Sequence, residues 1–260
     1  MRTRTSDGYE IHWERSGSDG DVLIMLHSLG SDSRMWAPQV ETLTPSYAVV
    51  TVDTRGHGAS SVPQGDYALE QLCADILAVA DDIGTARFHV VGLSLGGQMA
   101  LWLAAHHPER VITMTASNTG AKIGTDETWG ARVEAVRTDG MAAIRPSVVE
   151  RWFSGDFADR HPDWFETACS TFDGTNPTGY IGCCHALAGA DLRTDAARIT
   201  APSLIVGADE DVSTPPEQAR WLAARIPDAE LTIIEGAGHL SNLDRRTAFD
   251  RALTTFLGSP

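Results

Sequence analysis

The stretch FHVVGLSLGG, residues 88–97, decides the expected fold of this chain. Residues 88–92 form a short, mostly apolar run typical of a strand buried on both faces, and a helical pattern begins at Leu95. Between them, Gly92, Ser94 and Gly96 form a G-x-S-x-G turn, in which the glycines fit a crowded bend and the serine hydroxyl projects above the sheet. The stretch therefore predicts that Ser94 is a nucleophile at a helix N-terminus, whose dipole and free N–H groups stabilise nearby negative charge.

The same turn has two alternative interpretations. A glycine-rich strand-to-helix turn can hold a phosphate, but this one lacks both the G-x-G-x-x-G spacing and the lysine of phosphate-binding loops. A purely structural turn is the other alternative, and the sequence leaves it open.

Short apolar runs alternate with helical patterns on both sides of this stretch. The runs lie at residues 22–27, 47–52, 111–115, 203–207 and 231–234, and the helical patterns at 69–83, 95–106, 216–225 and 246–257. A hairpin is expected at the start, where residues 2–5 and 11–15 flank a turn at 6–8. This alternation predicts the α/β class, with a mostly parallel sheet flanked by helices on both faces.

Residues 119–197 interrupt the alternation because they contain no comparable buried strand. We expect them to form a helical lid, or cap, inserted between two parts of one core, residues 1–118 and 198–260. The lid is expected above the carboxyl ends of the strands, where such sheets bind ligands. For most of its aromatic side chains packing is the simpler role; they are Trp129, Trp152, Phe153, Phe157, Trp164, Phe165 and Phe172.

The composition excludes several classes of protein. The 260 residues have a formal net charge of −15, which repels phosphate backbones and anionic lipid, so neither a nucleic acid nor a membrane is an expected partner. No apolar stretch reaches the roughly 20 residues that cross a bilayer, and the N-terminus lacks the apolar run of a signal peptide. We expect a cytoplasmic protein that binds a small molecule; a homo-oligomer is left open.

The cysteines favour the same compartment. The four of them show no metal-ligand spacing, so no metal and no other cofactor is expected; they are Cys73, Cys169, Cys183 and Cys184. Reduced thiols are the default in a cytoplasm. A strained vicinal disulfide between Cys183 and Cys184 is the alternative to two thiols in a helix.

His239 is the candidate base among nine histidines. A serine hydroxyl is a weak nucleophile until a base takes its proton, and histidine suits that exchange near neutral pH. His239 lies in a loop between the last strand and the last helix, which places it at the same carboxyl edge as Ser94. His57, in RGHG at residues 55–58, is the rival but precedes the serine in the chain. A structural histidine remains the alternative for His239.

The acid that orients the histidine is expected after a strand between Ser94 and His239. The stretch GADEDVSTPP, residues 207–216, offers three carboxylates there, Asp209, Glu210 and Asp211. We choose Asp211 because its distance to residues 214–216 fits a loop that turns back toward the histidine. The resulting chain order is Ser94, Asp211, His239.

Two backbone N–H groups are expected to stabilise the oxyanion that forms when Ser94 attacks a carbonyl. One is that of Leu95, directly after the nucleophile. The other is expected in the stretch HSLG, residues 27–30, after the first buried strand, and Leu29 is the candidate.

With these residues in place, the chain resembles the α/β-hydrolases and, more narrowly, the 3-oxoadipate enol-lactonases of the bacterial β-ketoadipate pathway for aromatic degradation. The resemblance covers nearly the whole length. Many hydrolases share two of its motifs, DTRGHGAS at residues 53–60 and the G-x-S-x-G turn. Other motifs are more specific to the enol-lactonases: SLG at 28–30, NT at 118–119, Trp129 with Arg132, ERWF at 150–153, GY at 179–180, DLR at 191–193, residues 211–216 and HLSN at 239–242. The chain departs from the family at His27, where asparagine is expected, and at Glu210, an extra residue ahead of the acid. These departures permit a related lactonase with a different acyl group.

The resemblance implies hydrolysis of an unsaturated five-membered lactone that bears an acetate arm. Attack by Ser94 would release an enol that becomes a ketone, so the step runs downhill; an acyl-enzyme is the default, and direct attack by water activated by His239 is the alternative. The acetate arm requires a cation in an otherwise acidic protein, and arginine binds carboxylates with two hydrogen bonds. Arg132 and Arg151 are the candidates, beside Trp129 and Trp152, although each is as well explained as a solvated surface arginine.

Other functions fit the same residues. A broad carboxylesterase, another lactonase and a hydrolase of carbon–carbon bonds in ring-fission products would all keep Ser94, Asp211 and His239. A dehalogenase is disfavoured, because its nucleophile is a carboxylate where this chain has Ser94. A receptor of the hormone-binding type would retain the fold but produce one product per protein, so turnover distinguishes it from an enzyme.

Overall fold

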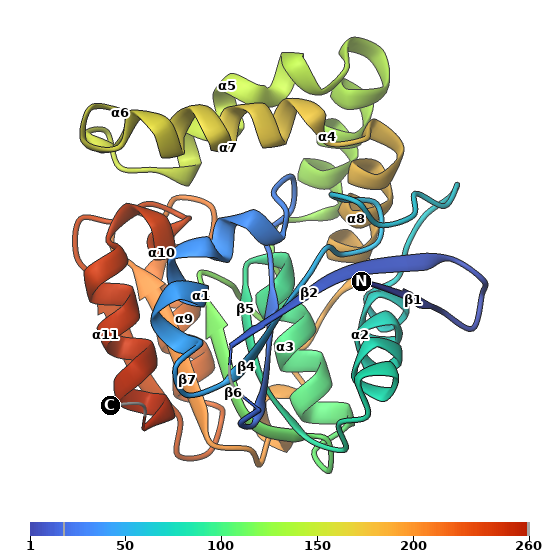
Figure 1. The fold of residues 1–260 in the computed structure, drawn as a ribbon. Helices are drawn as coiled ribbons and strands as arrows, with labels where there is room; N and C mark the ends of the chain where they lie inside the picture. Colours follow the sequence, from blue (N-terminus) through green and yellow to red (C-terminus); the bar gives the residue numbers. More distant parts are fainter. Residues whose placement is uncertain (18, 259–260) are drawn as a thin grey trace.

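One eight-stranded sheet organises the protein. The structure, a computed structural model that describes residues 1–17 and 19–258, has the strand order β1-β2-β4-β3-β5-β6-β7-β8 (Figure 1). The pairs β1–β2 and β2–β4 are antiparallel, and all later pairs are parallel. The strands are β1 (Arg2–Arg4), β2 (Glu10–Gly17), β3 (Val22–Leu26), β4 (Ala48–Val52), β5 (Phe88–Leu93), β6 (Val111–Ser117), β7 (Ser203–Ala208) and β8 (Glu230–Ile234).

The central strands are apolar because helices cover both faces of the sheet. Every residue of β3, β4, β5 and β7 is buried. The predicted class, the hairpin and the parallel core are therefore confirmed. Strand β6 continues to Ser117, two residues beyond the predicted end, because Ala116 and Ser117 pair with both β5 and β7 although they are not strongly apolar.

The helices of the core flank the sheet. In Figure 1, α2 and α3 lie on one side of the strands, and α1 and α11 lie on the other. Helices α2, α3 and α11 have the bounds predicted from sequence, whereas the short helices η1, α1, η2 and α10 were not predicted. The core helices are η1 (Ser33–Trp36), α1 (Ala37–Leu43), α2 (Leu69–Ile83), α3 (Leu95–His106), η2 (Ala196–Arg198), α9 (Pro216–Ala223), α10 (Ser241–Asp244) and α11 (Arg246–Leu257).

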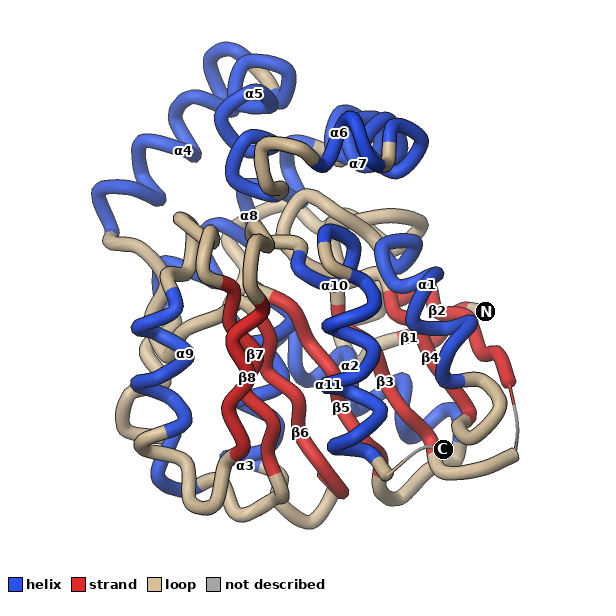
Figure 2. The backbone as a smooth tube through the Cα atoms, turned by 90° about the vertical axis from the view of Figure 1, so that its left-hand side faces the viewer, coloured by secondary structure: helices blue, strands red, loops and turns tan. Residues whose placement is uncertain are grey.

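Five further helices follow β6 in the chain and gather above the carboxyl ends of the strands. They are α4 (Asp126–Asp139), α5 (Met141–Trp152), α6 (Phe157–Arg160), α7 (Pro162–Gly174) and α8 (Pro177–Gly189). Figure 2 shows α4 to α7 as a layer over the sheet, with α8 between that layer and the core. The backbone of α8 approaches the core closely, since a Cβ on Gly179 would collide with the backbone of Gly56.

Aromatic packing holds this helical layer together. Phe153 stacks on Phe157 with ring centroids 3.9 Å apart, and Phe172 makes edge contacts with Trp152 and Tyr180. Most of the aromatic residues noted in the sequence therefore pack within the layer.

Candidate active site

Ser94 lies at the turn from β5 to α3 in a strained backbone conformation. Its φ of 59° and ψ of −113° fall outside the regions that a serine ordinarily adopts. The surroundings fix this conformation, because the Ser94 N–H donates to the carbonyl of Ser117 (2.9 Å) and its carbonyl accepts from Oγ1 of Thr119 (2.8 Å). Glycine is required at position 92, two residues before Ser94, because a Cβ there would strike the carbonyl of Gly96. The turn is therefore built to hold a serine in an unusual orientation.

His239 and Asp211 are hydrogen-bonded to each other. The Nδ1 atom of His239 lies 2.8 Å from Oδ2 of Asp211, and both side chains are buried. The same carboxylate accepts from Asn118 (3.0 Å), from the Thr214 hydroxyl (2.7 Å) and from the N–H groups of Ser213 and Thr214 (2.8 and 2.9 Å). Burial alone raises the pKa of Asp211, but the attraction of His239 and these hydrogen bonds outweigh it and lower the pKa to about 2. Asp211 is therefore a carboxylate at neutral pH.

The two neighbouring acidic residues, Asp209 and Glu210, make other contacts. Asp209 accepts a hydrogen bond from the N–H of Gly236 at 2.7 Å, which ties the end of β7 to the end of β8. The N–H of Glu210 donates to the carbonyl of Ala237 (3.1 Å), so this additional residue is accommodated by pairing with the loop that carries His239. Of the three carboxylates considered from sequence, Asp211 is the one that contacts His239.

His57, the rival histidine, is a buried acceptor. Its Nε2 accepts from the N–H of Gly30 at 3.0 Å, which requires the neutral ring. Burial, reinforced by the nearby ring of His27, lowers the pKa of His57 to about 3. His27 holds the same loop from the other side, because its Nε2 accepts from the N–H of Thr54 (2.9 Å) and its Nδ1 lies 2.7 Å from the carbonyl of Ser28. Both histidines therefore shape the 27–30 turn.

The N–H groups of Leu29 and Leu95 have no hydrogen-bond partner within residues 1–17 and 19–258. The side chain of Leu29 borders the cavity that Ser94 also lines, whereas that of Leu95 is fully buried and does not line it. Unpaired N–H groups at a helix start and on a loop are the kind of donor that an oxyanion requires.

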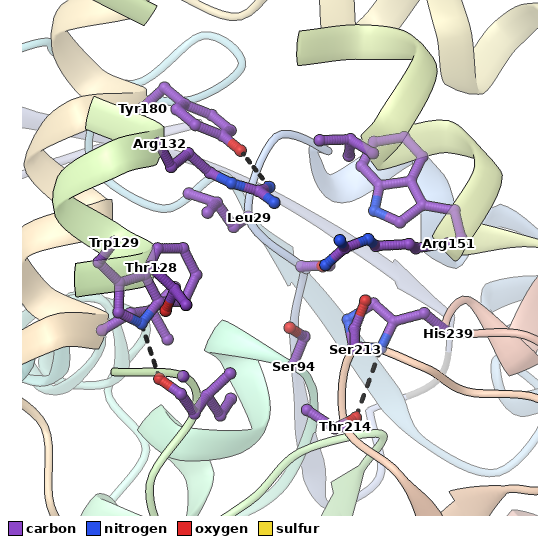
Figure 3. Close-up of a pocket in the computed structure, with 16 residues that line it drawn as sticks. Leu29, Ser94, Thr128, Trp129, Arg132, Arg151, Tyr180, Ser213, Thr214 and His239 are labelled. Atoms are coloured by element: carbon purple, nitrogen blue, oxygen red, sulfur yellow. Dashed lines mark hydrogen bonds between the residues drawn. The ribbon is translucent and has the colours of Figure 1, made fainter. Parts of the chain in front are cut away.

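A cavity of about 190 Å³ lies between the helical layer and the sheet (Figure 3). Ser94 and His239 both border it, and so do Leu29, Trp129, Arg132, Arg151, Trp152 and Tyr180. Within the described part of the chain, none of its lining residues carries a carboxylate. The cavity is smaller than most pockets for drug-sized ligands, so it suits a small molecule.

Two arginines project into this cavity from the helical layer. Figure 3 shows the guanidinium groups of Arg132 and Arg151 directed toward each other above Ser94. Arg132 donates to the hydroxyl of Tyr180 (3.2 Å) and lies over the ring of Trp129, with its Cζ 5.9 Å from the ring centroid. Neither arginine pairs with a carboxylate of any described residue. The site is therefore positively charged inside an acidic protein.

The two tryptophans differ in their contribution. The indole N–H of Trp129 donates to the carbonyl of Ile123 (2.7 Å), which fixes the ring that supports Arg132. Trp152 is 3% exposed and packs against Phe153 and Phe172, so it forms an apolar wall.

Three residues of the site were not assigned a role from sequence. Asn118 and Thr214 bind Asp211, and Tyr180 binds Arg132. Asn118 directly follows β6 and adopts a positive φ of 44°, so its place at the end of a strand is the signal that could have revealed it. Tyr180 and Arg132 lie 48 positions apart on different helices, a pairing that no local pattern indicates.

No group of three or more His, Cys, Asp or Glu side chains within the described residues is arranged to hold a metal ion. In the same part of the chain, no helix is long and apolar enough to span a membrane. The four cysteines are free thiols, and Cys183 and Cys184 lie buried in α8, as the helical interpretation predicted.

Comparison with known proteins agrees with this geometry. Residues 21–246 match the family described as the alpha/beta hydrolase fold. The 3-oxoadipate enol-lactonase 2 of Acinetobacter baylyi is 35% identical, with 96% of this chain and 94% of that protein covered. The crystal structure of the enol-lactonase from Burkholderia xenovorans LB400 superposes with a TM-score of 0.97 at 36% identity, covering 99% of this chain and 100% of that one.

A relative with a different ester substrate also matches. The pimeloyl-[acyl-carrier protein] methyl ester esterase of Chromobacterium violaceum is 33% identical, with 94% of this chain and 96% of that protein covered. The shared feature of these relatives is hydrolysis of an ester bond. The chain belongs to the α/β-hydrolase fold family, groups there with the 3-oxoadipate enol-lactonases, and is a hydrolase of carboxylic ester bonds.

Proposed function

We propose that this protein opens a small enol-lactone that carries a carboxylate, of the 3-oxoadipate enol-lactone type, with Ser94, His239 and Asp211 as its catalytic residues. The observation that carries the proposal is the pair of arginines, Arg132 and Arg151, that lines a cavity without carboxylates beside Ser94. Two guanidinium groups without a carboxylate partner beside Ser94 suit an anionic substrate, because each can bind a carboxylate with two hydrogen bonds.

The first step is attack on the lactone carbonyl. Because Nδ1 of His239 is engaged by Asp211, Nε2 is the nitrogen left to take the proton of Ser94. The serine oxygen then bonds to the carbonyl carbon, and the N–H groups of Leu29 and Leu95 stabilise the resulting oxyanion. Asp211, ionised at neutral pH, holds the imidazole and stabilises its protonated form.

The second step is opening of the ring. The bond between the acyl carbon and the ring oxygen breaks, and the enol oxygen receives the proton from His239. The enol then becomes a ketone, so it does not compete as a nucleophile for the acyl group. Water, deprotonated by His239, hydrolyses the acyl-Ser94 ester and releases a carboxylate.

The carboxylate arm of the substrate is assigned to the two arginines. In a chain of net charge −15 the long-range field opposes an anion, so the attraction must be local. Tyr180 and Trp129 hold Arg132 in one orientation, which lowers the entropy lost on binding. Trp152 provides an apolar wall for the ring.

The helical layer is assigned the role of a cap. Residues 119–197 would form the cap, and residues 1–118 and 198–260 the core. This division gives the arginines and tryptophans to the cap and Ser94, Asp211 and His239 to the core, so the substrate would be bound between the two.

A competition between substrates tests the proposal. The purified protein should consume the enol-lactone with many turnovers, at a kcat/KM well above that for a neutral methyl or nitrophenyl ester, and a chelator should leave the rate unchanged. A higher kcat/KM for the neutral esters would favour a broad carboxylesterase instead. One product per protein would indicate a receptor.

A further inference from the structure

Asp244, at the end of α10, is a buried carboxylate that the proposed reaction does not use. Its side chain is fully buried, and Oδ2 accepts from the N–H of Gly238 (2.8 Å) and from the N–H of Ser154 (2.7 Å). Oδ1 accepts from the Ser154 hydroxyl (2.8 Å), from Arg160 (2.7 Å) and from Arg245 (2.9 Å). Oδ2 therefore joins Gly238, the residue before His239, to Ser154, which lies just beyond α5 and 90 positions from Asp244.

The two segments that meet at Asp244 are those that carry His239 and Arg151. The N–H of His239 donates to the carbonyl of Arg151 (3.3 Å), and the N–H of Leu240 donates to the carbonyl of Trp152 (2.8 Å). Their backbones are so close that a Cβ on Gly238 would lie 2.7 Å from the carbonyl carbon of Phe153. Residues 238–240 and 151–154 thus run against each other, and Asp244 closes the end of this contact.

We propose that Asp244 is a positioning residue that sets His239 and Arg151 in register with each other. The inference rests on the proposed roles of His239 as base and Arg151 as carboxylate ligand. Asp244 touches neither the substrate nor the imidazole. It fixes the backbone of Gly238 on one side and that of Ser154 on the other, so the base and the substrate-binding arginine move as one unit.

The charge of Asp244 is necessary for this role. Its two oxygens face five donors, and a neutral amide of the same size would direct an NH₂ group toward some of them. The NH₂ group would face either the N–H groups of Gly238 and Ser154, which share Oδ2, or the guanidinium groups of Arg160 and Arg245 at Oδ1. Either orientation places donor against donor at a buried site and weakens the link between the two segments. Displacement of a catalytic group by about 1 Å costs about 10²-fold in rate, so a small separation has a measurable effect.

The test is Asp244→Asn with two substrates, the anionic enol-lactone and a neutral ester. We expect kcat to fall about 10- to 100-fold for both, because His239 shifts, and KM to rise for the lactone alone, because Arg151 shifts. Arg151→Gln should raise KM for the lactone with little change in kcat. Adding Asp244→Asn to Arg151→Gln should lower kcat without raising KM further.

The matched control is Asp250→Asn. Asp250 is a partly buried aspartate on the next helix, α11, and accepts from Gln39 and Thr42 away from the cavity. The substitution should leave kcat and KM unchanged. Ser154→Ala removes one donor to Asp244 and should reproduce the effects in weaker form, which keeps the test decisive should Asp244→Asn not fold.

An Asp244→Asn protein with a lower melting temperature but normal kcat and KM per active site would overturn the inference. Active sites are counted by labelling Ser94 with a fluorophosphonate. If Asp244→Asn does not fold, unchanged kcat and KM in Ser154→Ala would overturn it. Failure of the proposed function would look different. In that case the wild-type protein would not prefer the lactone, or His239→Ala would keep its activity, whatever Asp244 does.

Discussion

The hydrogen bond of 2.8 Å between His239 Nδ1 and Asp211 Oδ2 joins two loops that follow different strands, β7 and β8. Asp211→Asn should lower kcat on the enol-lactone by about 10³- to 10⁴-fold, because the amide no longer holds the required tautomer or stabilises the imidazolium. KM should change little, since Asp211 does not border the cavity. Steady-state kinetics measure both, with Asp209→Asn as the control that should retain kcat.

Acid stability should also depend on Asp211. Folding lowers the pKa of Asp211 from its ordinary value of 3.8 to about 2, so the ionised form stabilises the fold above pH 3.8. This contribution, roughly 2 kcal/mol, should be lost as pH falls from about 4 to 2. Urea unfolding of the wild type and Asp211→Asn at pH 7 and pH 3 measures it, and an equal pH dependence in the two proteins would contradict it.

His57 should contribute to stability in a higher pH window. Its pKa falls from the ordinary 6.5 to about 3 on folding, so below pH 6.5 the unfolded chain binds a proton that the folded protein does not. The contribution of neutral His57 to the free energy of unfolding is therefore fully present above pH 6.5 and declines as pH falls toward 3. His57→Gln, which keeps an acceptor for the Gly30 N–H, should flatten the decline between pH 6.5 and 4. If His57→Gln leaves the pH dependence of the free energy of unfolding unchanged, His57 does not cause the decline. Urea unfolding at several pH values measures this dependence.

Loss of either arginine assigned to the substrate carboxylate, Arg132 or Arg151, should raise KM. Arg132→Gln and Arg151→Gln should each raise KM for the anionic lactone about 10- to 100-fold, the usual effect of losing a hydrogen bond to a charged group, and leave the neutral ester unaffected. Arg137, an exposed arginine on the same helix as Arg132, supplies the control, and Arg137→Gln should have no effect. Equal losses on both substrates would assign these arginines to folding rather than to recognition.

Two cations also suit the product. Hydrolysis creates a second carboxylate, so the product carries two negative charges where the lactone carries one. Adipate should therefore inhibit competitively, more strongly than hexanoate of the same chain length, and Arg151→Gln should reduce the difference. Equal inhibition by the two acids would mean that only one arginine binds a carboxylate.

Local patterns were sufficient to predict the parts of the site that each lie on one element. The turn around Ser94 depends on residues 92–97, and the loop of His239 on its place after the last strand, so both could be located from sequence. The contact of Asp211, rather than Asp209, with His239 depends on how Glu210 pairs with Ala237, which the sequence indicates only weakly.

Long-range contacts account for what the sequence did not indicate. Asp244 meets Ser154 across 90 positions, and Gly30 meets His57 across 27, and each pair forms because separate elements pack together. The substitution of His27 for the expected asparagine was visible, but its meaning required the structure, in which the ring bridges Thr54 and Ser28.

The most direct test of the account is the kcat/KM of Ser94→Ala for the enol-lactone, measured on protein shown to be folded by circular dichroism. We predict a loss of about 10⁴-fold or more, because the nucleophile is removed while the cavity and the arginines remain. Activity close to that of the wild type would contradict the account, since the hydroxyl at position 94 would then not be the attacking group.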